Sequence, residues 1–308
     1  MVDDIKLGEN QLKAMKNISK HYSLYLKTAV SNYPSAKKFI ETAQLDLGAA
    51  KSMNDQNKKE LNPAIIFYIQ QSVEKFTKAY ALLFGSVSKK AMRDIGHLSG
   101  RAFVKALRNR DLGKMFDNLR KVSPLIFDDS ELRSFTFINL DKEADQMEDL
   151  LLSGEEAKWD CKEILDSFDK IRFDIALTLK SRRFNNQVYG LFSKILRPLI
   201  EKFWNPKMLD ENKPLFVAQY DLLCFLYPMV FITQKHEITS RYPSDKKNEK
   251  SPVDYVDGDI DIVKERNRIL SGLEKINERI NSLSLTIKKI SEMDKGKRDI
   301  LFKKFFGE

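Results

Sequence analysis

Apolar residues in the first third of the chain recur at helical spacing in consecutive stretches. Residues 9–31 carry apolar side chains three or four positions apart, and a second stripe runs from Phe39 to residue 53. Tyr33-Pro34-Ser35 lies between them, where proline interrupts a helix and Ser35 can cap the next one. The pattern therefore predicts two helices separated by a break at 33–35.

The following helix is delimited by its own end signals. Residues 54–60 are polar and predict a loop, and Asn62-Pro63 is a favourable N-cap and first-turn pair. The helical pattern continues to residue 84, where Gly85 is suited to a left-handed C-terminal conformation. A further helix is expected to begin at Lys89 or Ile95 and to reach about residue 107.

The middle of the chain predicts more helices and no strands. Residues 108–180 are charged and largely helical in pattern, and helices resume over 183–204 and 214–235. The segment 243–261 is rich in Pro, Asp, Lys and Gly, which predicts a linker. We expect an all-α protein, a helical bundle with a helical insertion and a C-terminal coiled-coil helix. The expected divisions are 1–34, 35–107, 108–180, 181–245, 246–261 and 262–308.

The C-terminal segment has the most regular apolar pattern in the chain. Residues 262–290 place Ile or Leu at alternating spacings of three and four, as in a coiled coil, with Arg266 at one position of the seam. We expect one continuous helix that buries this stripe against a second copy or against its own bundle. The preceding linker favours the second copy. The predicted homodimer contact consists of Ile269, Leu273, Ile276, Ile280, Leu283 and Ile287.

Composition narrows the class of protein. The chain has 308 residues, of which 42% are hydrophobic and 31% charged, as in a globular protein with a full core. Two cysteines, Cys161 and Cys224, do not indicate a disulfide scaffold. No apolar run approaches the roughly 18 residues of a membrane span, and the first residues show no signal-peptide pattern. We expect a cytoplasmic protein without a metal or cofactor.

The net charge of +9 is unevenly distributed. Residues 128–169 carry 14 acidic and 4 basic side chains, a net of −10, which leaves +19 on the remainder. This is compatible with polyanion binding, with association between opposite charges, or with an ordinary mixed surface. The best candidates for polyanion binding are Arg101, Lys105, Arg108, Arg110 and Lys114.

Polar residues gather on one face of the helix predicted at 62–84. Gln71, Glu74 and Lys78 are three or four positions apart with Lys75 beside them, and Glu74 can pair with Lys78. Taken alone, this pattern indicates a surface ion pair on an amphipathic helix.

Four segments in order carry a family resemblance. Residues 70–79 read Gln-Gln-Ser-Val-Glu-Lys-Phe-Thr-Lys-Ala, and residues 43–50 follow Ala-x-x-Asp-Leu-x-x-Ala. Gly-His-Leu follows at 96–98 and Arg-Tyr-Pro at 241–243. Together they resemble the HEPN family (higher eukaryotes and prokaryotes nucleotide-binding), over about 35–245 with 108–180 as an insertion.

The resemblance implies a helical bundle, often dimeric, in a family of toxins, partners of minimal nucleotidyltransferases, ribonucleases and nucleotide-binding modules. Its ribonucleases carry an arginine, four to six residues, and then a histidine, which supplies a base near the 2′-hydroxyl and a cation for the phosphate. None of His21, His97 and His236 follows an arginine at that spacing. We therefore expect no catalytic residues.

The resemblance leaves the roles of two residues open. His97 either binds a phosphate or nucleotide with Lys75, Lys78 or Arg241, or starts a helix and pairs with Asp46 or Glu74. Arg241 is either such a ligand contact or a structural ion-pair partner of Asp46 or Glu74. We expect Asp46, Glu74, Lys78 and Arg241 to converge inside the bundle.

These observations favour a non-catalytic binding or regulatory module. It would recognise a nucleotide or RNA, or pair with a nucleotidyltransferase-type partner in a toxin–antitoxin or defence system. The alternatives are a ribonuclease toxin with an unconventional active site and a purely structural oligomer.

The purified protein is expected not to cleave RNA in a histidine- or metal-dependent way, because the Arg-to-His spacing is not found. The measurement is a gel assay of unstructured RNA with the wild type and His97→Ala, each with and without a chelator. Robust cleavage that disappears in His97→Ala would contradict the spacing argument.

Overall fold

The computed structural model describes residues 9–85, 87–95, 161–162, 165–166, 226, 229–230, 232–234, 236–242 and 251–306, without the side chains of 9–22, 94, 237–238 and 301–306. All regular secondary structure in these ranges is helical, which confirms the all-α expectation for this part of the chain. The elements are α1 (Glu9–Asp55), η1 (Lys59–Leu61), α2 (Asn62–Phe84), α3 (Lys89–Ile95), α13 (His236–Thr239), α14 (Pro252–Val256), α15 (Asp261–Lys264), α16 (Arg266–Glu292) and α17 (Lys295–Phe306).

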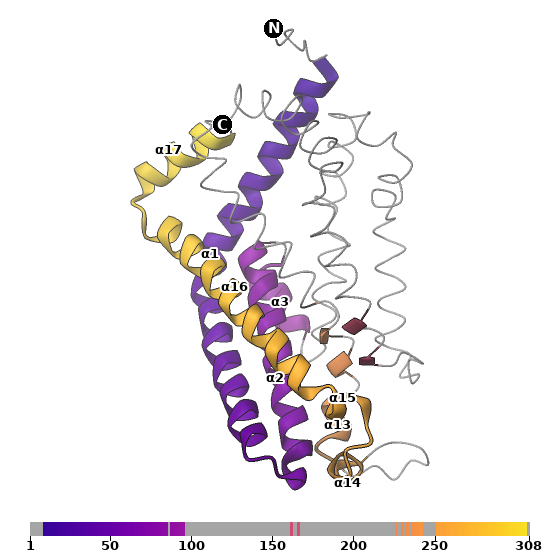
Figure 1. Ribbon diagram of the computed structural model, residues 1–308. Coiled ribbons are helices and arrows are strands. Elements are labelled where there is room, and N and C mark those ends of the chain that lie inside the picture. Colours follow the sequence, from indigo (N-terminus) through magenta and orange to yellow (C-terminus); the bar gives the residue numbers. More distant parts are fainter. Residues whose placement is uncertain are drawn as a thin grey trace, which may run out of the picture.

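The centre of the fold is the antiparallel pair α1 and α2, joined by a short turn (Figure 1). Alanines recur every seven residues along α1, and each is at most 1% exposed. They are Ala29, Ala36, Ala43 and Ala50. Larger apolar residues alternate with them, including the buried Leu26, Ile40 and Leu47. Because alanine is short, this stripe lets the two helix backbones approach closely.

Small residues of α2 lie opposite the alanine stripe. Ser72 Oγ donates a hydrogen bond to the carbonyl oxygen of Ala43, at 3.1 Å. A Cβ added at Gly85 would stand 2.0 Å from the carbonyl oxygen of Tyr25 and 3.1 Å from the amide nitrogen of Ala29. Gly85 also ends α2 with φ +78°, a left-handed conformation that favours glycine.

The expected helix break at 33–35 is wrong, because α1 continues through Pro34. An internal proline costs a helix roughly 3 kcal/mol through a lost hydrogen bond and a clash. Burial on both sides of the proline offsets this cost, since Asn32 and Ala36 are both buried. The Asn32 amide donates to the carbonyls of Leu82 and Val87, at 3.3 and 2.9 Å, and so ties α1 to the end of α2. Position 34 is therefore not a division of the chain.

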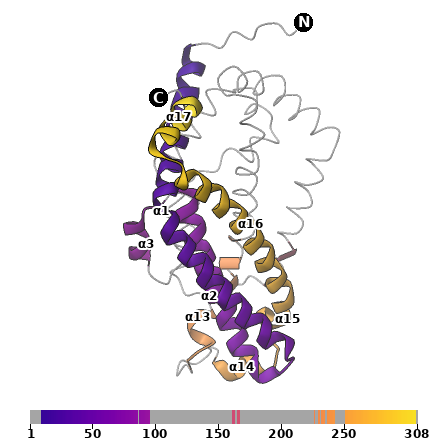
Figure 2. The ribbon, with the colours of Figure 1, turned by 90° about the vertical axis from the view of Figure 1, so that its left-hand side faces the viewer.

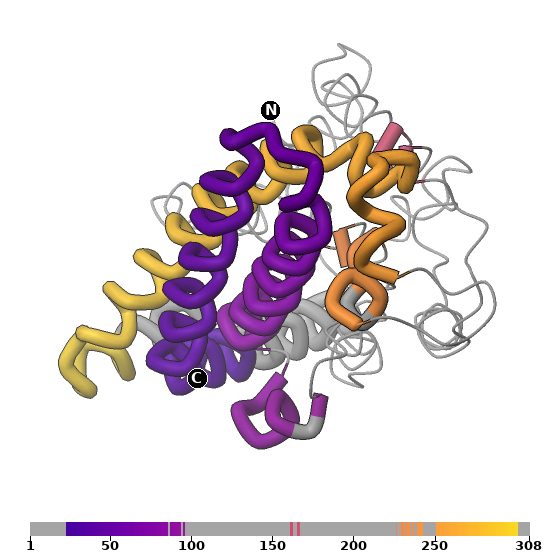
Figure 3. Tube along the Cα trace, turned by 90° about the horizontal axis from the view of Figure 1, so that it is seen from below, coloured from indigo at the N-terminus to yellow at the C-terminus, as the bar shows by residue number. Residues whose placement is uncertain are grey.

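Helix α16 crosses α1 and α2 diagonally (Figures 2 and 3). Polar pairs fix it antiparallel to α1. The Gln44 amide donates to Asn277 at 2.8 Å, Lys51 pairs with Glu274, and the Asn54 amide donates to Asn267 at 2.9 Å. The hydrogen bond from Lys51 to Glu274 raises the pKa of Lys51.

The apolar seam of α16 is buried inside its own chain. All six residues of the predicted homodimer contact are at most 1% exposed: Ile269, Leu273, Ile276, Ile280, Leu283 and Ile287. The intramolecular alternative is therefore the correct one, since these side chains have no surface left for a second copy. The helix is also not continuous from 262, because Glu265 separates α15 from α16. Arg266 donates instead to the Asn54 side chain and to the Val263 carbonyl, both at 2.9 Å.

The described part of the expected linker, 251–261, is ordered and packed against α2. Tyr255 of α14 is fully buried, and its carbonyl accepts a hydrogen bond from the Asn62 amide at 3.1 Å. The Tyr255 hydroxyl lies 2.7 Å from His236 Nδ1 and 2.7 Å from Thr239 Oγ1. Burial raises the pKa of Tyr255. The composition of this segment predicted a linker because its charged residues outnumber the one aromatic residue that anchors it.

A short piece of the charged region also contacts α16. Cys161 and Leu165 are buried in the core. Asp166 pairs with Lys162 and with Arg268 of α16, at 2.7 Å each. The hydrogen bond from Lys162, and to a smaller extent that from Arg268, lowers the pKa of Asp166. Within the described ranges, no helix combines the length and the apolar character needed to cross a bilayer.

Ile276→Ala is expected to lower the free energy of unfolding by about 2–5 kcal/mol, because it opens a cavity beneath α16. Leu285→Ala, at a 57% exposed position of the same helix, should change it by less than about 0.5 kcal/mol. Urea denaturation measures both. Equal effects of the two substitutions would contradict the packing of α16.

Candidate functional site

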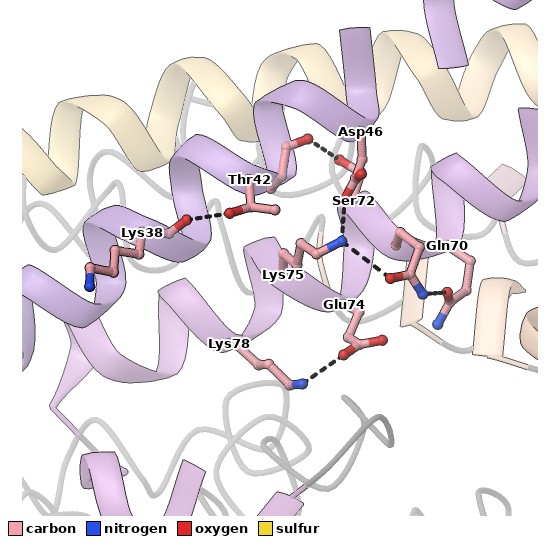
Figure 4. A network of polar contacts seen from close by, with 10 residues as sticks. Lys38, Thr42, Asp46, Gln70, Ser72, Glu74, Lys75 and Lys78 are labelled. Atoms are coloured by element: carbon pink, nitrogen blue, oxygen red, sulfur yellow. Dashed lines mark hydrogen bonds and ion pairs between the residues drawn. The ribbon is translucent and has the colours of Figure 1, made fainter. Parts of the chain in front are cut away.

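The residues that carry the sequence pattern lie on α2 and are collected here as the α2 polar face: Gln70, Gln71, Glu74, Lys75 and Lys78. In Figure 4, Lys75 reaches Asp46 on α1, whereas Lys78 and Glu74 pair with each other on α2. Helix α2 is buried on most of its circumference, so even these polar positions are shielded from solvent. Because charges in such surroundings need partners, the pairing on this face decides its role.

Glu74 and Lys78 form an ion pair within α2. Lys78 Nζ lies 2.6 Å from Glu74 Oε1, and the two side chains are only 10% and 4% exposed. The Lys78 ammonium also lies 5.8 Å from the centre of the Phe39 ring of α1. The expected i,i+4 pair is thus present, but in the interior rather than on the surface.

Lys75 connects α2 to α1 through an ion pair with Asp46. Lys75 Nζ donates a second hydrogen bond to Gln71 Oε1 at 3.2 Å, and the Gln71 amide donates to Gln70 Oε1 at 2.7 Å. The Lys75 and Asp46 side chains are 19% and 15% exposed. This chain of contacts holds α1 and α2 in one register, since Asp46 lies one helical turn beyond Ala43 on α1.

Arg241 does not join these pairs, which corrects the expected convergence of Asp46, Glu74, Lys78 and Arg241. Its side chain is exposed, and its guanidinium carbon lies 4.9 Å from the centre of the Phe67 ring. Phe67 lies in the first part of α2, about two turns before Glu74. Arg241 is therefore not the structural ion-pair partner of Asp46 or Glu74.

Several candidate residues fall outside the described residues. They are His97 and the polyanion candidates Arg101, Lys105, Arg108, Arg110 and Lys114. Their predicted roles stay predictions.

Sequence reasoning missed two groups of side chains. One is the buried contact of His236 and Thr239 with Tyr255, which the predicted linker concealed. The other is the aromatic surroundings of Arg241, since Tyr242 lies 5.1 Å from the same guanidinium carbon. The residue spacing gave no signal that Arg241 would lie over Phe67, because about 170 residues separate the two.

Both lysines of the α2 polar face are already paired with carboxylates: Lys75 with Asp46, and Lys78 with Glu74. In the described part of the chain, no group of three or more His, Cys, Asp and Glu side chains is arranged to hold a metal ion. Comparison with protein-family models, with curated proteins and with solved structures gives no match to this chain.

The Glu74–Lys78 pair predicts a non-additive pattern of stability. Lys78→Met should cost about 3–5 kcal/mol by leaving a carboxylate in the interior, whereas Lys78→Met combined with Glu74→Leu should cost less than Lys78→Met alone. Urea denaturation of the two single variants and the double variant measures this coupling.

The matched control is the Lys37–Glu41 pair of α1, which has the same i,i+4 spacing and side chains 57% and 58% exposed. Lys37→Met should change the free energy of unfolding by less than about 1 kcal/mol. If Lys78→Met were as mild as the control, the pair would have no structural role.

Proposed function

We propose that this chain is a non-catalytic, HEPN-like binding module that recognises single-stranded RNA through cations outside the α2 polar face. The observation that supports it is the use of the α2 lysines. Lys75 is paired with Asp46 and Lys78 with Glu74, so both lysines of the family-like pattern neutralise carboxylates of the same chain. Ligand contact then falls to other basic residues.

The charge distribution supports a polyanion as the ligand. The chain has a net charge of +9, although one segment alone contributes −10. Part of that acidic segment is engaged internally, since Asp166 pairs with Arg268. Cations that neutralise phosphates release counterions, which drives binding to nucleic acid and makes it sensitive to salt. The basic run from Arg101 to Lys114 is the proposed principal contact.

Binding of a fluorescein-labelled, unstructured 20-nucleotide RNA tests the proposal, measured by fluorescence anisotropy at several salt concentrations. The wild type should bind with an affinity that falls as salt rises. The triple variant Arg101→Gln, Lys105→Gln, Arg108→Gln should bind more weakly, with a salt slope reduced by about 0.7 for each phosphate contact removed.

A control with the same loss of charge is Lys264→Gln, Lys289→Gln, Lys295→Gln, at exposed positions of α15, α16 and α17. It should retain most of the affinity. Equal loss in both triple variants would show a non-specific effect of net charge, and no binding by the wild type would refute the proposal. In that case, recovery of a nucleotidyltransferase-type protein from native lysate would support the other partner that the resemblance implies.

A further inference from the structure

Three side chains form a group that is here named the Arg–aromatic cluster: the half-buried Phe67 and the exposed Arg241 and Tyr242. The guanidinium carbon of Arg241 lies 4.9 Å from the centre of the Phe67 ring and 5.1 Å from that of Tyr242. Phe67 in turn lies against Tyr68, with 5.2 Å between the ring centres. A guanidinium at these distances from aromatic rings is held by cation–π attraction.

A cation–π contact does not occupy the N–H donors of a guanidinium as a hydrogen bond does. Among the residues that the structure describes, none accepts a hydrogen bond from Arg241 and none forms an ion pair with it. An arginine has five N–H donors in a planar fork that matches phosphate or carboxylate. Arg241 is thus packed on two rings, and within the described ranges its donors meet no protein acceptor.

The ring of Tyr242 is also accessible to a ligand. Tyr242 is 56% exposed and lies beside the Arg241 guanidinium. An exposed tyrosine alone is common on protein surfaces. An exposed ring next to a guanidinium is a combination that nucleic-acid-binding proteins use, since bases stack on aromatic rings and phosphates accept hydrogen bonds from arginine.

The cluster is attached to a rigid part of the fold. Helix α13 precedes it directly, and its buried His236 contacts the fully buried Tyr255 through a hydrogen bond of 2.7 Å. Thr239 contacts the same hydroxyl at 2.7 Å, and Ser240 Oγ donates to the His236 carbonyl at 2.7 Å. Arg241 and Tyr242 therefore follow an anchored backbone, which reduces the ordering cost of binding.

We infer that the Arg–aromatic cluster binds one nucleotide of a single-stranded RNA, with its base stacked on Tyr242 and its phosphate hydrogen-bonded to Arg241. This inference rests on the proposed function. It adds a second RNA contact, at Arg241 and Tyr242, to the one proposed for the basic run from Arg101 to Lys114. Stacking is tolerant of base identity because every base has a π-face, so the site selects single strands over duplexes.

Two fluorescein-labelled probes, each 12 nucleotides long, separate base stacking from phosphate binding. One is oligouridylate RNA and the other is an oligomer of abasic sugar phosphates, and binding of each is followed by fluorescence anisotropy. Tyr242→Leu should weaken binding of oligouridylate by at least about fivefold while leaving the abasic oligomer unaffected. Tyr242→Phe keeps the ring and should bind both probes as the wild type does. Arg241→Gln should weaken both probes, and Lys289→Gln is the control for the loss of one exposed charge.

The outcomes distinguish this inference from the proposed function. If the wild type does not bind oligouridylate, both fail. If the wild type binds and the Tyr242 and Arg241 variants bind equally well, only the cluster is overturned. Equal weakening of both probes by Tyr242→Leu, or preference of the wild type for an oligoglutamate peptide, also overturns it. Circular dichroism confirms folding, and if Tyr242→Leu does not fold, Arg241→Gln with both probes decides the question.

Discussion

The close approach of α1 and α2 is the constraint on which the rest of the described structure depends. Alanine every seven residues on α1 lets the backbone of α2 come near enough for Ser72 to hydrogen-bond the Ala43 carbonyl. Near the end of α2, the same proximity leaves no room for a side chain at residue 85. A larger residue at any of these positions would separate the helices, and a separation would break the polar contacts that span them.

This packing explains why the charges of α2 are internal. With the two backbones close together and α16 laid across them, α2 has little exposed circumference, so Glu74 and Lys78 neutralise each other inside the bundle. Lys75 reaches across to Asp46 and fixes the register of α1 against α2. Buried pairs of this kind bring modest net stability but penalise any arrangement that separates them. Their effect is to specify one alignment of the helices and to leave external binding to other residues.

The surface around Arg241 is built by segments that are distant in sequence. Helix α14 fixes the end of α13 through the Tyr255 hydroxyl, and Arg241 then comes to lie over Phe67 of α2. The guanidinium is therefore oriented by a surface that the bundle and the 251–261 segment build together. A guanidinium packed on a ring differs from a lysine on a mobile stem, since less side-chain entropy is lost when it binds a ligand.

The sequence by itself determined the local features: the helical character of the described residues, the end of α2 at Gly85, the i,i+4 pairing of Glu74 with Lys78 and the apolar stripe of α16. These depend on residues within a turn or two of one another, where spacing reports geometry directly. Tertiary structure alone decided the continuity of α1 through Pro34, the burial of Tyr255 and the intramolecular partner of α16. Each is a competition between a local preference and burial against a distant segment, and a stripe of Ile and Leu does not specify which apolar surface will cover it. For the same reason, the α2 polar face was predictable by residue type, whereas the position of Arg241 over Phe67 was not.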